Sequence, residues 1–180
     1  FCERHERLDI LVNNAGVVGE QKPLAEQSDE EWQRIMRVNL DGAFYVLRAA
    51  LNIMLKQDTS GCIVNMASIC GLIGWKNIGP YTATKGALVS LTRSTAIEYG
   101  KKNIRVNALA PTAVLTPMVK EFIDKSPDPK KSLADMEMMN PLPGVPLPEN
   151  IAAAALFLAS DESRYFNVFF LHKFHGYTAR

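Results

Sequence analysis

Tyr81 and Lys85 are the residues of this sequence whose types and spacing suggest acid–base catalysis. They stand four positions apart in Tyr81-Thr82-Ala83-Thr84-Lys85, so a helix would place them one turn apart on the same face. A phenol with a pKa near about 10 is a poor acid–base group at neutral pH, but a neighbouring ammonium lowers that pKa. Lys85 would thus make Tyr81 a proton donor or acceptor. The alternative is two exposed side chains on a helix surface.

Ser68 is the residue expected to hold a substrate oxygen beside Tyr81. It follows the apolar run from Cys62 to Ala67, and its hydroxyl could hydrogen-bond that oxygen while Tyr81 moves the proton. A serine after a strand is also common as a helix cap or turn residue, which is the alternative interpretation.

The chemistry must be positioned by parallel strands. Leu8–Val12, 62–67 and 104–110 are short apolar runs typical of buried parallel strands. Ligands of open α/β sheets bind beyond the carboxyl ends of such strands. Asn13-Asn14-Ala15-Gly16 occupies such an end; a plain turn is the alternative, because Asn and Gly are turn formers.

Helices are predicted between these strands. Ser28 and Glu31 form a capping-box pattern that starts a long helix reaching Met54. Asn39 falls within it, although Asn competes for the helix backbone; an asparagine hydrogen-bonded in the core is the alternative to a functional one. Pro80 suits the first turn of the helix that carries Tyr81. That helix should end near Gly100, and 149–159 should form the last helix.

Five separated motifs resemble, in order and spacing, the classical short-chain dehydrogenase/reductase family, from about Leu8 to Ser163. The motifs are Asn13-Asn14-Ala15-Gly16, Val38-Asn39-Leu40-Asp41-Gly42, Asn65-Met66-Ala67-Ser68, Tyr81-x-x-x-Lys85 and Arg105-Val106-Asn107-Ala108-Leu109-Ala110-Pro111. The resemblance implies an α/β fold, a single Rossmann-like domain over 1–180 with a doubly wound parallel sheet. It also implies hydride transfer between NAD or NADP and a secondary alcohol or ketone.

The resemblance assigns roles to four residues. Tyr81 is the general acid–base, and Lys85 lowers its pKa and touches the nicotinamide ribose. Ser68 polarises the substrate carbonyl. Asn39 kinks its helix and holds a water in the proton relay. The positions expected to contact the cofactor are Asn13, Ala15, Gly16, Tyr81, Lys85, Pro111, Thr112, Val114 and Thr116. Thr112 departs from the family, which has glycine there, so a side chain stands where backbone would approach the cofactor.

The substrate is expected to meet Cys70, Trp75 and Met118, although a surface loop is the alternative for the segment of the first two. Residues 117–148 are rich in Pro and Met and are predicted to be a mobile lid over the substrate. The other interpretation is that this segment only covers the hydrophobic core and has no role in substrate specificity.

Two stretches depart from the family. The sequence contains no glycine-rich turn of a first βαβαβ portion, so we expect an N-terminally truncated domain that starts within the fold. Such a chain should bind NAD(P) more weakly than a millimolar Kd, about −4 kcal/mol, and should not turn over. A non-catalytic fragment, acting as an interaction module or without function, is therefore the alternative. In the tail, Val168 stands in place of the usual glycine, and Phe174-His175 stand in place of Asp-Gly.

Composition narrows the partners. The sequence contains 20 Lys and Arg residues and 19 Asp and Glu residues. This nearly neutral charge balance gives no indication of binding to nucleic acid or to a membrane surface. Cys2, Cys62 and Cys70 have no metal-ligand spacing, and His172 with His175 lack a third ligand, so no metal is predicted. We expect a cytoplasmic protein with reduced thiols. The family resemblance implies a homodimer or homotetramer through the helices that carry Trp32 and Tyr81.

Overall fold

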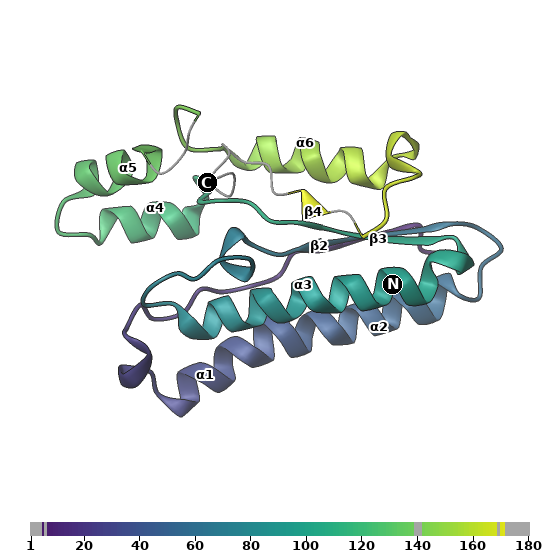
Figure 1. Ribbon diagram of the computed structural model, residues 1–180, viewed down its shortest axis with the longest axis horizontal. Helices are drawn as coiled ribbons and strands as arrows, with labels where there is room; N and C mark the ends of the chain where they lie inside the picture. Colours follow the sequence, from purple (N-terminus) through teal and green to yellow (C-terminus); the bar gives the residue numbers. More distant parts are fainter. Residues whose placement is uncertain (1–4, 6, 139–141, 169, 172–180) are drawn as a thin grey trace.

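A four-stranded parallel sheet in the order β1-β2-β3-β4 forms the centre of the molecule. The structure is a computed structural model that describes residues 5, 7–138, 142–168 and 170–171. Figure 1 shows the sheet between two layers of helices, as expected for a doubly wound α/β fold. The strands are β1 (Ile10–Asn13), β2 (Gly61–Met66), β3 (Ile104–Leu109) and β4 (Phe170–Leu171).

The strands differ in how well they are covered. β2 and β3 are almost wholly buried because they are apolar and have neighbours on both sides. β1 is an edge strand within the described sheet, and both Ile10 and Val12 leave 46% of their surface exposed. Exposed apolar side chains on an edge strand favour pairing with another chain.

The predicted long helix is interrupted at Asn39. Helix α1 (Asp29–Met36) runs into one π-helical turn (Arg37–Asp41), and α2 (Gly42–Met54) continues from it. Ser28 caps α1 by accepting a hydrogen bond from the backbone N–H of Glu31. A full capping box would also have the Glu31 side chain accept from the backbone N–H of Ser28. That part of the prediction is wrong, because the Glu31 carboxylate instead accepts from the N–H of Glu20 and pairs with Arg34.

Helix α3 (Gly79–Tyr99) lies beside α2 on one face of the sheet (Figure 1). Pro80 stands in its first turn, as predicted, and Gly100 is its C-cap. The core on this face combines α2 and α3 side chains such as Leu47, Met54 and Ala96 with Ile63 and Val106 of the strands.

The opposite face is covered by α6 (Pro148–Ala159), whose Ile151 and Leu158 pack against Val64 and Leu109. The segment 117–148, predicted to be a mobile lid, consists for the most part of helices α4 (Pro117–Asp124) and α5 (Pro129–Met138). Pro117 and Pro129 start these helices rather than break them, since proline suits a first helical turn. Among the described helices, none has the length and apolar character needed to span a membrane.

Short 3-10 turns connect these elements. They cover Leu24–Glu26, Ile69–Gly71, Gly100–Lys102 and Asp161–Ser163.

The atypical tail is anchored to β3 up to Val168. The Asn167 side chain accepts from the N–H of Val106 at 2.9 Å and donates to the carbonyl of Ala96 at 3.0 Å. Val168, which replaces the family's glycine, has a φ of +62°, a left-handed conformation that costs a β-branched residue about 1–2 kcal/mol. The tail residues Phe169, His172, Phe174 and His175 lie outside the described part of the chain.

Candidate active site

Ser68 and Tyr81 meet beyond the carboxyl ends of the central strands. Ser68 follows β2 and is 7% exposed, and its Oγ accepts a hydrogen bond from the N–H of Cys70 at 3.2 Å. Tyr81 stands in the first turn of α3, where its hydroxyl lies close enough to Ser68 for that side chain to lower its pKa in part. The side chains predicted to move a proton and to hold a substrate oxygen are therefore neighbours.

Lys85 is buried one turn further along α3, with 5% of its surface exposed. Its Nζ donates to the carbonyl oxygen of Met66 at 2.6 Å and lies 5.6 Å from the centre of the Tyr81 ring. Burial lowers the pKa of Lys85 to about 8, since desolvation disfavours the ammonium. The amine is still mainly protonated at neutral pH.

The pKa of Tyr81 moves opposite to the direction predicted from its spacing to Lys85. Burial of the hydroxyl raises it to about 12, although the hydrogen bond with Ser68 lowers it in part. The prediction failed because spacing describes distance along a helix and not solvation. The ammonium bonds to Met66 on β2, and loss of water around the phenolate dominates.

Asn39 is 1% exposed and ties the π-helical turn to the loop after β1. Its amide accepts from the N–H of Val17 and donates to the Val17 carbonyl, both at 2.7 Å. It also donates to Oγ1 of Thr84 at 3.3 Å, and that hydroxyl donates to the carbonyl of Tyr81 at 2.7 Å. Thr84 is a link that the sequence analysis missed; its only signal was its place directly before Lys85.

Gly16 lies where these groups converge. A Cβ built on it would stand 3.3 Å from Oδ1 of Asn39 and 3.6 Å from Nζ of Lys85. The end of the Asn13–Gly16 segment is therefore brought to the same site, and Ala15 beside it is exposed. The Asn13 side chain instead braces the sheet, donating to the carbonyl of Ala43 at 3.0 Å and to Oδ1 of Asn65 at 3.2 Å.

The segment after β3 borders the site from the other side. The carbonyl of Pro111 accepts from the N–H of Ile69 at 3.0 Å, which joins this segment to the turn after Ser68. Oγ1 of Thr112 is buried and has no hydrogen-bond partner among the described residues. Val114 packs against the core under α6, and the Thr116 hydroxyl caps α4 by accepting from the N–H of Val119.

An apolar cluster surrounds Tyr81. Cys70 and Trp75, two of the three predicted substrate contacts, belong to it; the remaining members are Val18, Ile69, Ile73 and Ile78. Met118 does not: it lies on α4 and is 45% exposed. The Tyr81 ring thus lies between this apolar surface and the ammonium of Lys85.

The described cysteines are unsuited to thiolate chemistry. Cys62 and Cys70 are both buried and unpaired with each other, and burial raises the pKa of each thiol. Within the described residues, no three His, Cys, Asp or Glu side chains gather in a group that could hold a metal ion.

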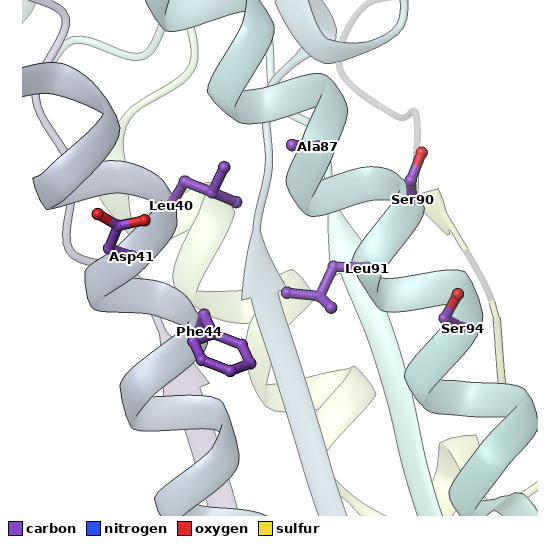
Figure 2. Close-up of a pocket in the computed structure, with 7 residues that line it drawn as sticks. All are labelled: Leu40, Asp41, Phe44, Ala87, Ser90, Leu91 and Ser94. Carbon is purple, nitrogen blue, oxygen red and sulfur yellow. The ribbon is translucent and has the colours of Figure 1, made fainter. Parts of the chain in front are cut away.

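A separate groove runs between α2 and α3 and contains neither Ser68 nor Tyr81 (Figure 2). It has a volume of about 570 Å³, and its lining residues are Leu40, Asp41, Phe44, Ala87, Ser90, Leu91 and Ser94. Beside it, the guanidinium of Arg48 lies over the rings of Phe44 and Tyr45, at 5.0 and 5.6 Å from their centres. Both rings are substantially exposed, at 40% and 55%.

Comparison with known proteins gives relatives over nearly the whole chain. Residues 1–178 match the family model described as Enoyl-(Acyl carrier protein) reductase. Levodione reductase of Leifsonia aquatica is 39% identical over 167 residues, which cover 92% of this chain and 62% of that protein. A 3beta-hydroxysteroid dehydrogenase of Eggerthella lenta is 41% identical over 158 residues, or 88% and 59% of the two chains. A cyclopentanol dehydrogenase of a Comamonas species is 37% identical over 174 residues, or 97% and 67%.

Solved structures agree with these sequence relatives. The crystal structure of levodione reductase superposes with a TM-score of 0.94 at 37% identity, covering 98% of this chain and 69% of that one. A 4-hydroxyisoleucine dehydrogenase complexed with NADH gives a TM-score of 0.90 at 31% identity, covering 99% and 71%. ElxO with NADP bound gives 0.91 at 29% identity, covering 99% and 70%. This chain spans 62% and 59% of the lengths of the first two sequence relatives.

Proposed function

The chain belongs to the short-chain dehydrogenase/reductase family, and from that premise we propose that it transfers a hydride between NAD or NADP and a secondary alcohol or ketone. The observation that carries the proposal is that Ser68, Tyr81 and the buried Lys85 lie together beyond the carboxyl end of β2. Asn39, the fourth residue of the proposed catalytic set, joins the backbone of the Tyr81 helix through Thr84.

Three features of the chain fit a nicotinamide dinucleotide. Parallel strands end at the site, as in dinucleotide-binding folds. Gly16 leaves room beside Lys85, whose ammonium suits the hydroxyls of a ribose. The buried hydroxyl of Thr112 has no described partner, so a carboxamide could satisfy it. Relatives with NADH or NADP bound support the same cofactors. The proposed contacts are Asn13, Ala15, Gly16, Tyr81, Lys85, Pro111, Thr112, Val114 and Thr116.

The proton is moved by Tyr81 in this proposal. The bound nicotinamide supplies or accepts the hydride. Because its pKa is raised to about 12, Tyr81 holds its proton at neutral pH, which is the form that donates to a ketone oxygen during reduction. Ser68, which lies next to the Tyr81 hydroxyl, donates a hydrogen bond to the ketone oxygen and orients it. In the oxidative direction Tyr81 first releases its own proton to solvent, and its phenolate oxygen then accepts the proton of the alcohol.

The substrate is a neutral alcohol or ketone on an apolar ring. Cys70 and Trp75 supply apolar surface next to Tyr81, against which an apolar ring can pack. The names of the 3beta-hydroxysteroid and cyclopentanol dehydrogenases, which specify ring-bound hydroxyl groups, agree with this class.

Two further parts of the molecule serve this function. Helices α4, which carries Met118, and α5 act as a lid over the substrate. Apolar side chains of α4 are available for this contact, since Met118 and Phe122 remain 45% and 40% exposed. The groove between α2 and α3 (Figure 2) takes the same helices of a second copy in a homodimer or homotetramer. Exposed Phe44 and Tyr45 beside the groove supply the apolar surface for that contact.

The proposal is tested by turnover. The assay uses this chain and the longest protein that contains it, with NAD or NADP and a panel of cyclic secondary alcohols. Open-chain hydroxy acids of similar size serve as charged controls. The expected result is that, in at least one of the two protein forms, the neutral cyclic alcohols reduce either nicotinamide and the hydroxy acids do so much less. If no alcohol reduces either cofactor in either protein form, the proposed function is wrong.

A further inference from the structure

Gly71 makes the closest approach between the turn that follows Ser68 and helix α3. A Cβ built on Gly71 would lie 2.6 Å from both the carbonyl carbon and the carbonyl oxygen of Lys85, and 3.0 Å from the nitrogen of Gly86. Contacts under 3.0 Å are essentially never made by real Cβ atoms, and here the neighbouring atoms are backbone atoms in mid-helix. The turn can therefore approach the backbone of α3 this closely only with a glycine at position 71.

The turn that contains Gly71 also holds Ser68 in place. The N–H of Gly71 donates to the carbonyl of Ser68 at 2.9 Å, and the N–H of Cys70 donates to its Oγ at 3.2 Å. On the other side, the N–H of Ile69 donates to the carbonyl of Pro111 at 3.0 Å. The turn is thus held between the end of β3 and the backbone of α3.

The same stretch of α3 carries the proposed acid–base residue. Tyr81 lies one helical turn before Lys85, so the backbone touched by Gly71 is rigidly connected to the Tyr81 Cα. The Ser68 side chain lies close enough to the Tyr81 hydroxyl to lower its pKa in part. The depth at which Gly71 seats against Lys85 therefore sets the separation between the two hydroxyls.

We infer that Gly71 is a positioning residue, which holds Ser68 at the correct distance from Tyr81 by allowing backbone-to-backbone contact with α3. This inference rests on the proposed function and deepens it. An alanine needs its Cβ at 3.4–4 Å from such atoms instead of 2.6 Å, so the turn must move away from α3 by roughly 1 Å. A displacement of that size in a catalytic group can lower the rate about 100-fold.

Gly86 supplies a matched control from the same contact. A Cβ on Gly86 would lie 3.6 Å from the carbonyl oxygen of Gly71, which is ordinary van der Waals contact. Gly86→Ala therefore adds one methyl group to the same interface without forcing the two backbones apart.

The kinetic test compares Gly71→Ala with Gly86→Ala in the parent and in a Ser68→Ala background. We expect Gly71→Ala to lower kcat about 100-fold while the Kd for NADH or NADPH stays close to that of the parent. Gly86→Ala should retain the parent kcat. In the Ser68→Ala background, Gly71→Ala should have little further effect, because the group that it displaces is already gone. An equal loss in both backgrounds would overturn the inference.

Labelling of Cys70 provides a readout that does not need turnover. Cys70 directly precedes Gly71 and is 8% exposed, so a turn lifted from α3 should expose its thiol. Gly71→Ala should raise its rate of modification by a thiol reagent several-fold, with the site assigned by peptide mass, and Gly86→Ala should not. If the parent shows no turnover but the Cys70 labelling rates of Gly71→Ala and Gly86→Ala still differ in this way, the proposed function is wrong. The contact between Gly71 and α3 is then supported independently of it.

A milder variant covers the case in which Gly71→Ala does not fold. Gly86→Val keeps a Cβ that fits and adds γ carbons towards the Gly71 carbonyl. It should reproduce a smaller loss of kcat with the same dependence on Ser68. Parent-like kcat and parent-like Cys70 labelling in every folded variant would refute the role of Gly71.

Discussion

Replacing Lys85 by Met should change how the stability of the protein depends on pH. Lys85 is 5% exposed, and its ammonium has one described hydrogen bond, to the carbonyl of Met66. Burial lowers its pKa from 10.5 to about 8. Met keeps the length of the side chain and removes the titrating group, so the pH-dependent cost of burying the charge disappears.

The sign of the effect follows from proton binding in the two states. Below about pH 8, the amine is protonated both folded and unfolded, and the full cost of burying the charge is present. Between about 8 and 10.5, the unfolded chain still binds the proton and the folded chain has released it. Stability of the parent relative to Lys85→Met therefore rises across this window. The shift from 10.5 to about 8, at about 1.36 kcal/mol per pKa unit, corresponds to about 3 kcal/mol.

The assay is urea unfolding of the parent and Lys85→Met at several pH values from about 7 to about 10. Loss of the bond to Met66 costs about 1 kcal/mol, but this cost does not depend on pH and cannot imitate the slope. Lys76→Met removes an exposed lysine and is the control; it should leave the pH dependence of the parent unchanged. If the free energy of unfolding changes equally with pH in the parent and in Lys85→Met, burial of the Lys85 charge has no cost and the reasoning is refuted.

Two further predictions concern catalysis and assembly. Tyr81→Phe removes only the proton-carrying oxygen, so turnover should fall about 10²–10⁴-fold with nearly intact cofactor binding in a titration; substantial residual activity would contradict the role of Tyr81. Ala87→Arg places a long charged side chain in the groove between α2 and α3 and should shift the sedimenting mass towards the monomer, whereas a parent that already sediments as a monomer would refute the proposed assembly.

Local sequence patterns were enough to predict the elements that present the candidate site. The apolar runs before Asn13 and Ser68 are confirmed as parallel strands, and Pro80 begins the predicted helix that carries Tyr81. These predictions succeed because strand burial and helix starts depend on residues close together in the chain. The lid segment shows the limit of local signals, since its richness in proline gave no indication of helices, whereas Pro117 and Pro129 each start one.

Contacts between distant segments were decided by the tertiary structure. The spacing of Tyr81 and Lys85 is visible in the sequence, but burial raises the pKa of Tyr81 to about 12, because solvation depends on everything packed around a group. The need for glycine at position 71 is equally invisible in the sequence. It arises only when the turn after Ser68 meets the backbone of Lys85. The residues of the site can be predicted from local patterns, whereas their electrostatics and spacing are set by what the fold places against them.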